Sequence, residues 1–456
     1  MARKSISRDA RQLELAFGDR GEAPRADASG QATTAATDRD DPATSLLLER
    51  VLERPNLVRA WKRVKQNGGS PGIDGMTVND LRVWLDANWS RVREELLAGT
   101  YQPTPVQRVA IPKRSGGERL LGIPTVLDRL IQQAILQILQ PLFDPSFSEH
   151  SHGFRPGRKA HDAVNAARAY VQSGKRWVAD VDLEKFFDRV NHDVLMGRLA
   201  KRLSDRRLLG LIRRYLNAGV MVNGVVVERH EGTPQGGPLS PLLANVLLDE
   251  VDKELERRGH AFARYADDLR VFVGSKRAGH RVMRSLIRLF DRLRLRVNRS
   301  KSAVAHALAR PFLGFALWVA PGRRVQVRVS REALDTMKDR VRRLTRRTRG
   351  RSLGTVIADL RTYLLGWKGY FRLAATPRVF ATLDEWIRHR LRAYQLKQWK
   401  RGKTVFRELR ARGASTDLAA QVAANATRWW HNSAKLLNRA LPNSFFLALG
   451  LPALSP

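Results

Sequence analysis

The chain has 456 residues, with 82 Lys and Arg residues against 44 Asp and Glu residues and a formal net charge of +38 at pH 7. So much positive charge repels itself unless a polyanion neutralises it, so nucleic acid is the expected partner. The chain has no cysteine, which excludes disulfides, a thiolate nucleophile and Cys-ligated zinc. It also lacks an apolar run long enough for a membrane span or a secretory signal. We therefore expect a cytoplasmic protein.

Hydrophobic spacing predicts a mixture of helices and strands after residue 45. Helices are expected from Ser45 to the Gly-Gly pair at 68–69 and from Thr77 to Leu97, followed by a β-hairpin in VQRVAIPKRSGGERLLGIP. LDRLIQQAILQILQPLF has helical spacing, and RWVADVDLEKFF reads as a strand that enters a helical turn. A further helix begins near Ser240, AFARYADDLRVFVGS reads as strand, tight turn and strand, and a last amphipathic helix spans 278–295.

Charge and composition divide the chain unevenly. The first 45 residues carry 7 basic and 8 acidic residues among small ones, a composition typical of disorder. Residues 331–412 hold 23 basic and 7 acidic residues, a net charge of +16, together with many aromatic residues. We predict boundaries near Arg331 and Gly413, which leave 46–330 and 413–456 as the remaining segments.

Three carboxylates follow apolar strands. Asp267 and Asp268 are adjacent in the expected turn, and Asp182 follows the strand VADV, with Asp180 on the same face of that strand. Neighbouring carboxylates are costly unless a cation neutralises them, and three of them suit a two-metal phosphoryl-transfer site. The alternative is a purely structural role, because an Asp-Asp pair is often part of a turn and an Asp after a strand is often a helix cap.

Two further stretches are candidates for nucleotide binding. The Gly-rich string TPQGGPLSPL allows a close approach of the backbone to phosphate or base, and Lys113 and Arg119 flank the turn of the predicted hairpin. A plain loop and solvated charge are the alternatives for these features.

Taken in order, these pieces resemble bacterial group II intron-encoded reverse transcriptases, also called maturases. The resemblance rests on GGSPGIDGMT, IPKRSGGERLLGIPTVLDRL, HGFRPGRKAHDAV, DVDLEKFFDRVNHD, GTPQGGPLSPLLANVLLDEVDKEL, RYADD, LRVNRSKS and RPFLGF. It continues through LLGWKGYFR and LDEWIRHRLRAYQLKQWKR, and covers residues 46–456. It implies an α+β, right-hand polymerase with fingers and palm in 46–330, a helical thumb and maturase region in 331–412, and a helical, candidate DNA-binding segment in 413–456. The HNH nuclease of many relatives is not expected, because its cysteines are missing.

The resemblance also implies a set of site residues. Asp182, Asp267 and Asp268, with the carbonyl of Leu183, would bind two Mg²⁺ ions, with Mn²⁺ as an alternative. Phe187 would exclude a 2′-OH, and its alternative is core packing. Gln235, Lys113 and Arg119 would contact the incoming nucleotide, and Lys301 would lie near the leaving phosphate. Arg270 is unexplained: it can face a phosphate or solvent.

RNA binding is expected in the basic, aromatic region even without the resemblance, because Arg and Lys contact phosphates and exposed aromatic rings stack on bases. The alternative is a helical core of aromatic residues beneath solvated charge. The predicted RNA contacts are Arg155, Arg158, Trp367, Lys368, Arg388, Arg390, Arg392, Lys397, Lys400 and Arg401.

The expected function is an RNA-directed DNA polymerase of a group II intron, which copies intron RNA into DNA for retrohoming and assists splicing. Its expected partners are intron RNA, an RNA template with a DNA primer, dNTPs and target DNA. The oligomeric state is left open, with a dimer as one alternative. The competing functions are a domesticated reverse transcriptase in DNA repair or phage defence, and an RNA-folding cofactor without polymerase activity.

Overall fold

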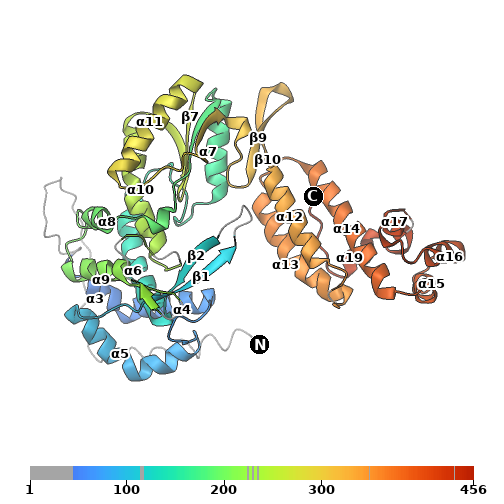
Figure 1. Ribbon diagram of the computed structural model, residues 1–456, viewed down its shortest axis with the longest axis horizontal. Helices are drawn as coiled ribbons and strands as arrows, with labels where there is room; N and C mark the ends of the chain where they lie inside the picture. Colours follow the sequence, from blue (N-terminus) through green and yellow to red (C-terminus); the bar gives the residue numbers. More distant parts are fainter. Residues whose placement is uncertain are drawn as a thin grey trace, which may run out of the picture. The chain divides into compact units, whose positions relative to one another are not determined.

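The computed structural model describes residues 45–112, 118–222, 225–227, 231–233, 236–348, 350–435 and 437–455 (Figure 1). The chain divides into two compact units, Met1–Ala167 with Trp177–Ala305, and Arg168–Arg176 with His306–Pro456. The predicted disorder of residues 1–45 falls outside the described residues except at Ser45. Within the described ranges, every helix is too short or too polar to cross a membrane.

The first part of unit 1 combines a helical cluster with a small sheet. Its strands have the order β2-β1-β4-β5, with β1 antiparallel to β2 and parallel to β4. The elements are α3 (Leu47–Leu52), α4 (Arg54–Asn67), α5 (Asp80–Ala98), β1 (Val106–Pro112), β2 (Glu118–Ile123), α6 (Val126–Phe143), α9 (Arg206–Asn217), β4 (Val220–Val222) and β5 (Val225–Val227). The predicted helices and hairpin are therefore confirmed. Helix α6 begins where the Thr125 side chain accepts a hydrogen bond from the Asp128 amide, as an N-cap residue does.

The second part of unit 1 is built on a four-stranded sheet with the order β6-β7-β3-β8. Strand β7 pairs antiparallel with both β3 and β6. The elements are α7 (Ala160–Gln172), which runs on into unit 2, β3 (Trp177–Val181), α8 (His192–Leu199), α10 (Ser240–Arg257), β6 (Ala261–Tyr265), β7 (Asp268–Val273), α11 (Lys276–Arg292) and β8 (Ala303–His306). Helix α11 packs on β7, as Figure 1 shows, and on β3. Helix α10 packs on β6. This sheet, antiparallel across β6, β7 and β3 and covered by helices, confirms the α+β prediction.

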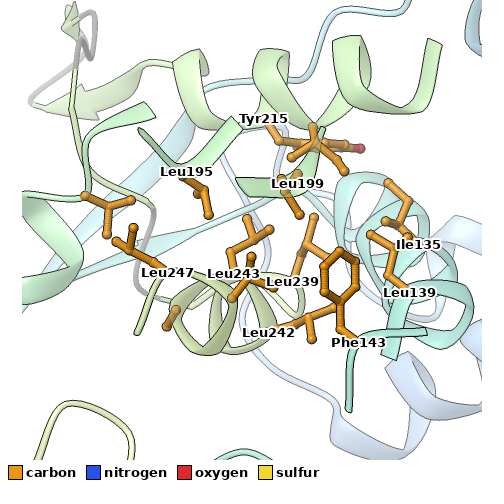
Figure 2. Packing of buried hydrophobic residues seen from close by; sticks show 14 of the residues in the cluster. Ile135, Leu139, Phe143, Leu195, Leu199, Tyr215, Leu239, Leu242, Leu243 and Leu247 are labelled. Atoms are coloured by element: carbon orange, nitrogen blue, oxygen red, sulfur yellow. The ribbon is translucent and has the colours of Figure 1, made fainter. Parts of the chain in front are cut away.

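One continuous core joins these helices. Leu139 and Phe143 of α6, Leu195 of α8, and Leu243 and Leu247 of α10 are at most 2% exposed and turn toward one another (Figure 2). Burial of a large apolar side chain stabilises a fold by about 1.5–3 kcal/mol. The cluster also contains residues of β3 and β7. The core therefore fixes the sheet that carries the acidic residues.

Unit 2 is mostly helical. Its hairpin packs through Phe315, whose ring lies 5.0 Å from that of Phe371. The elements are β9 (Phe315–Ala320), β10 (Arg324–Val329), α12 (Arg331–Leu344), α13 (Leu353–Phe371), α14 (Pro377–Trp399), α15 (Gly402–Arg410), α16 (Thr416–Ala424), α17 (Trp429–Lys435), α18 (Leu437–Ala440) and α19 (Asn443–Ala448). The Asp384 carboxylate accepts hydrogen bonds from the backbone amides of Leu454 and Ser455, which ties the last described residues to α14.

Candidate active site

The Asp-Asp pair lies at a tight β-hairpin. Tyr265 of β6 pairs with Asp268 of β7, so Ala266 and Asp267 alone form the loop. Ala266 adopts the left-handed conformation with φ 57°, which is uncommon for a residue with a Cβ. Asp267 therefore lies in the turn and Asp268 begins β7, as the sequence pattern predicted.

Asp182 lies at the same end of the sheet. Val181, the last residue of β3, pairs with Leu269 of β7. One more step in this antiparallel register places Asp182 opposite Asp268. Because side chains alternate along strands, the Asp180 and Arg270 pair lies on the same face as these two acidic residues.

Electrostatics shows that these carboxylates act on one another. Burial, and next the negative charge of Asp267, raise the pKa of Asp268 to about 6, while Arg270 opposes this shift. Burial also raises the pKa of Asp182; the positive charge of Lys301 opposes the shift, and the charge of Asp267 adds to it. The three predicted acidic residues are therefore within electrostatic range, at a cost that a bound cation can relieve.

The segment that contains NRSKS is hydrogen-bonded to the backbone of Asp182. The backbone amide of Asn298 donates to the Asp182 carbonyl at 2.8 Å, and the Asp182 amide donates to the Ser302 hydroxyl at 3.0 Å. Leu183 forms a bridge with Val297 and is 6% exposed. Lys301, which the family resemblance places near a leaving phosphate, lies close enough to Asp182 to affect its pKa.

The donor set fits a hard divalent cation. In the described residues, no three His, Asp or Glu side chains are arranged to enclose a metal ion. Mg²⁺ does not need such a cage, because it keeps several waters and is often held by one or two carboxylates together with substrate phosphates. Mutually repelling carboxylates at one edge of a sheet supply oxygen ligands of this kind.

Phe186 and Phe187 take different positions. Phe186 is 3% exposed and lies in the core, while Phe187 is half-buried with its ring edge-on to Phe186 at 5.1 Å. The Phe187 carbonyl accepts from the Thr233 amide at 2.7 Å, so the start of the Gly-rich loop is tied to this residue. Lys113 and Gln235 lie outside the described residues. Arg119 pairs with Ile111 in the β1–β2 hairpin.

A buried polar network behind the turn was missed by the sequence reasoning. The Arg264 guanidinium, 1% exposed, donates to Asp252 of α10 at 2.6 Å and to the Ala266 carbonyl at 2.9 Å. It also donates to the Ser151 hydroxyl at 2.7 Å. A charged residue inside the apolar strand AFARY was the available signal, since buried arginines need partners. Arg264 thus holds the carbonyl of the left-handed turn residue.

The segment HSHGFR lies against the same turn. A Cβ added at Gly153 would be 2.1 Å from the Ala266 amide nitrogen, so only glycine fits this contact. Asn245 donates to the Gly153 carbonyl at 2.9 Å. Arg155, one of the predicted RNA contacts, is 7% exposed and donates to Asp144 and to the Ser148 and Ser151 carbonyls. Arg158 pairs with Glu149 at 2.6 Å.

The other predicted RNA contacts lie in unit 2 in different environments. Trp367 is 8% exposed, and the Lys368 ammonium donates to the Ala453 carbonyl at 2.9 Å. Arg392 is 5% exposed and donates to the Leu441 carbonyl, and burial followed by the charge of Arg388 lowers its pKa to about 10.

Other predicted cations on α14 and directly after it are nearer the surface. Arg390 and Lys397 lie 5.4 Å and 4.2 Å from the ring centres of Trp386 and Trp429. Lys400 and Arg401 are exposed. RNA contact at all these positions stays a prediction.

Comparison with known proteins gives the family context. Residues 111–317 match the family described as "Reverse transcriptase (RNA-dependent DNA polymerase)", and residues 334–413 match "Group II intron, maturase-specific domain". The chain is 33% identical over 317 residues to Protein YkfC of Escherichia coli, which covers 60% of this chain and 83% of YkfC.

Other similarities cover less of each protein. The chain is 36% identical over 208 residues to the Group II intron-encoded protein LtrA of Lactococcus lactis, which covers 45% of this chain and only 34% of LtrA. A chain of a partial Cas6-RT-Cas1–Cas2 complex is 28% identical with a TM-score of 0.36, over 53% of this chain and 41% of that one. Both matched domains are present in the order that the sequence resemblance implies. The chain belongs to the family of group II intron reverse transcriptases and maturases.

Proposed function

We propose that this chain is an RNA-directed DNA polymerase that copies intron RNA into DNA for retrohoming and uses its maturase region to assist splicing. The observation that carries the polymerase proposal is the placement of Asp182 opposite Asp268, with Asp267 in the adjoining turn. Burial and the neighbouring charge of Asp267 raise the pKa values of Asp182 and Asp268, and a bound cation would offset this effect. We place this activity in the cytoplasm.

Reverse transcriptases use divalent metal ions, and in this chain Asp182, Asp267, Asp268 and the Leu183 carbonyl would hold two Mg²⁺ or Mn²⁺ ions. Bound divalent ions lower the pKa of a primer 3′-OH and neutralise the pyrophosphate that leaves. The chain itself holds Asp182 and Asp268 opposite each other at the ends of paired strands, with Asp267 in the adjoining turn. We propose that the bulk of its half-buried Phe187 side chain excludes a ribose 2′-OH.

Charge near the carboxylates supports the handling of a triphosphate. Lys301 is close enough to oppose the raised pKa of Asp182, so it can also neutralise a phosphate bound there. Lys113, Arg119 and Gln235 are proposed as nucleotide contacts on their sequence positions alone. The incoming dNTP, the DNA primer and the RNA template are the proposed substrates.

The maturase proposal rests on the matched domain and on charge. Residues 331–412 carry a net charge of +16, and several of their arginines and lysines face tryptophan rings rather than carboxylates. Cations that are not neutralised within the protein are available to phosphates. Intron RNA and target DNA are the proposed partners. Size measurements on the complex of this chain with RNA would show whether the chain is a monomer or a dimer.

Primer extension on an RNA template tests the polymerase proposal. The double variant Asp267→Ala, Asp268→Ala should lose extension while it keeps RNA affinity, and Asp86→Ala, an exposed acidic residue on α5, is the control. Extension that survives the double change would overturn the metal-site assignment. Wild-type RNA binding without any extension would instead favour the RNA-folding cofactor.

RNA affinity measured against salt tests the maturase proposal. Each phosphate contact contributes about 0.7–0.9 to the slope of log affinity against log salt. Replacement of the exposed Lys400 and Arg401 by alanine should therefore reduce the magnitude of this slope by about one to two. The control Arg91→Ala, at an exposed position on α5, should leave the slope unchanged. A splicing assay with the parent intron RNA separates a maturase from a domesticated reverse transcriptase, which would extend primers without an effect on splicing.

A further inference from the structure

Phe154 combines two unfavourable features beside the catalytic turn. Its side chain is 44% exposed, and its φ is 60°, in the left-handed region. Single exposed apolar residues are normal on protein surfaces, so exposure alone means little. Left-handed backbone is uncommon for residues with a Cβ and is most easily adopted by glycine, asparagine and aspartate. Among the described non-glycine residues with positive φ, Phe154 is the only aromatic one.

The residues on both sides of Phe154 are buried and firmly bonded. On the N-terminal side, the His152 amide donates to the Arg264 carbonyl at 2.9 Å. Gly153 lies directly against the backbone of Tyr265 and Ala266. On the C-terminal side, the Arg155 guanidinium donates to Asp144 at 2.9 Å. The left-handed conformation at Phe154 is therefore imposed by its flanks.

This construction presents an aromatic ring to solvent one residue from the contact with Ala266. A fold that needed only the turn would gain stability from glycine or asparagine at this position, because either residue adopts the conformation at lower cost. Local strain of this kind persists when the surroundings enforce it, and it concentrates at binding and catalytic sites. The exposed ring of Phe154 is therefore expected to serve a binding role rather than the stability of the fold.

We propose that Phe154 is a nucleic-acid-binding residue whose ring packs against a base or sugar of the primer–template duplex at the polymerase centre. The inference rests on the proposed polymerase function, because that function brings a primer end to the Asp267–Asp268 turn. An aromatic face accepts any base, so this contact adds affinity without sequence preference. The rigid flanks fix the distance between this contact and the carboxylates.

Equilibrium binding of a fluorescent DNA primer annealed to an RNA template, measured by anisotropy in EDTA, tests the proposal without turnover. Phe154→Asn keeps a residue that tolerates the left-handed backbone and removes the ring, whereas Phe154→Tyr keeps the ring. Loss of one stacking contact typically weakens binding about fivefold or more, so we expect this loss for Phe154→Asn and less than a twofold change for Phe154→Tyr. Val83→Asn is the control, because Val83 is an exposed apolar residue on α5.

Thermal unfolding of the same variants separates binding from folding. Phe154→Asn should unfold at or above the wild-type temperature, since it relieves the unfavourable conformation. Binding by Phe154→Asn within twofold of wild type, or equal losses in Phe154→Asn and Phe154→Tyr, would overturn the proposal. Failure of the wild type to extend primers would overturn the polymerase function instead, and the anisotropy result for Phe154 would still stand.

Discussion

Asp180 and Arg270 face each other across β3 and β7, and the Arg270 guanidinium donates to the Asp180 carboxylate at 3.3 Å. Both side chains are largely buried, with 13% and 10% of their surfaces exposed. From the sequence, Arg270 was expected either to contact a phosphate or to face solvent. The solvent-facing role is wrong, because the Arg270 side chain is largely buried. Arg270 neutralises the acidic residue that lies two positions before Asp182, and its charge opposes the raised pKa of Asp268.

Removal of one partner of this pair should therefore be costly. Arg270→Gln leaves Asp180 uncompensated beside Asp182 and Asp268, and we expect a loss of about 3 kcal/mol in the free energy of unfolding. The neutral pair Asp180→Asn, Arg270→Gln should recover most of this loss, because no buried charge remains alone. Urea unfolding of the two single variants and the double variant measures the coupling. Additive losses in the double variant would contradict the pairing.

The sequence predicted the placement of the acidic residues well because that placement follows from strand periodicity. The two-residue separation of Asp180 and Asp182 fixes their common face, and the short distance between two apolar strands fixes the hairpin at Asp267. These are local properties, so hydrophobic spacing and turn length were sufficient.

The scaffold behind the site was not predictable in the same way. Arg264 is tied to Asp252 on a neighbouring helix and to Ser151, which is 113 residues away. A charged residue within an apolar strand hints at a buried arginine, but local spacing does not identify its four partners, which are Asp252, Asn245, Ser151 and the Ala266 carbonyl. The contact of Gly153 with Ala266 likewise depends on tertiary packing, although the motif HGFR marked the segment as part of the family pattern.

The two neighbouring phenylalanines offer a direct test of sugar discrimination. Phe187→Ala should increase ribonucleotide incorporation because it removes bulk near the proposed 2′ position, and at a half-buried site it should cost less stability than removal of a fully buried ring. Phe186→Ala is the matched change: its ring is 3% exposed, so we expect a loss of about 3–5 kcal/mol in unfolding free energy. Incorporation of rNTPs against dNTPs on one template measures the ratio. An unchanged ratio in Phe187→Ala would assign this ring to packing alone.

His152 should make the fold sensitive to mild acid. Its side chain is 7% exposed, and within the described chain neither ring nitrogen has a hydrogen-bond partner. Burial, and next the positive charge of Arg158, lower its pKa from 6.5 to about 4. The folded state then keeps His152 neutral where the unfolded chain binds a proton, so this contribution to stability is complete above pH 6.5 and is lost as the pH falls toward 4.

Comparison with a variant isolates this effect from other titrations. Between pH 7 and pH 4.5, wild type should lose roughly 1–2 kcal/mol more unfolding free energy than His152→Leu, after allowance for solvent screening. His280→Leu, at an exposed position on α11, is the control. Parallel pH profiles for wild type and His152→Leu would show that His152 is protonated equally in the folded and unfolded states.

The contact between Gly153 and Ala266 should be essential for activity. A methyl group at Gly153 would lie 2.1 Å from the Ala266 nitrogen, and because both groups are backbone-linked, the turn that carries Asp267 and Asp268 must move. A displacement of about 1 Å at a reacting centre can cost about 100-fold in rate. We therefore expect Gly153→Ala to lower single-turnover extension by about that factor, with a loss of about 1–3 kcal/mol in unfolding free energy from overpacking.

Gly197 provides the matched substitution. It lies within α8, and no atom is within 4 Å of a Cβ built there, so Gly197→Ala should keep full extension and add up to about 1 kcal/mol of stability through helix propensity. Single-turnover extension and urea unfolding, measured on both variants, separate misplacement of the turn from general destabilisation. If Gly153→Ala extended primers at the wild-type rate, the position of this turn would not depend on the segment that contains Gly153.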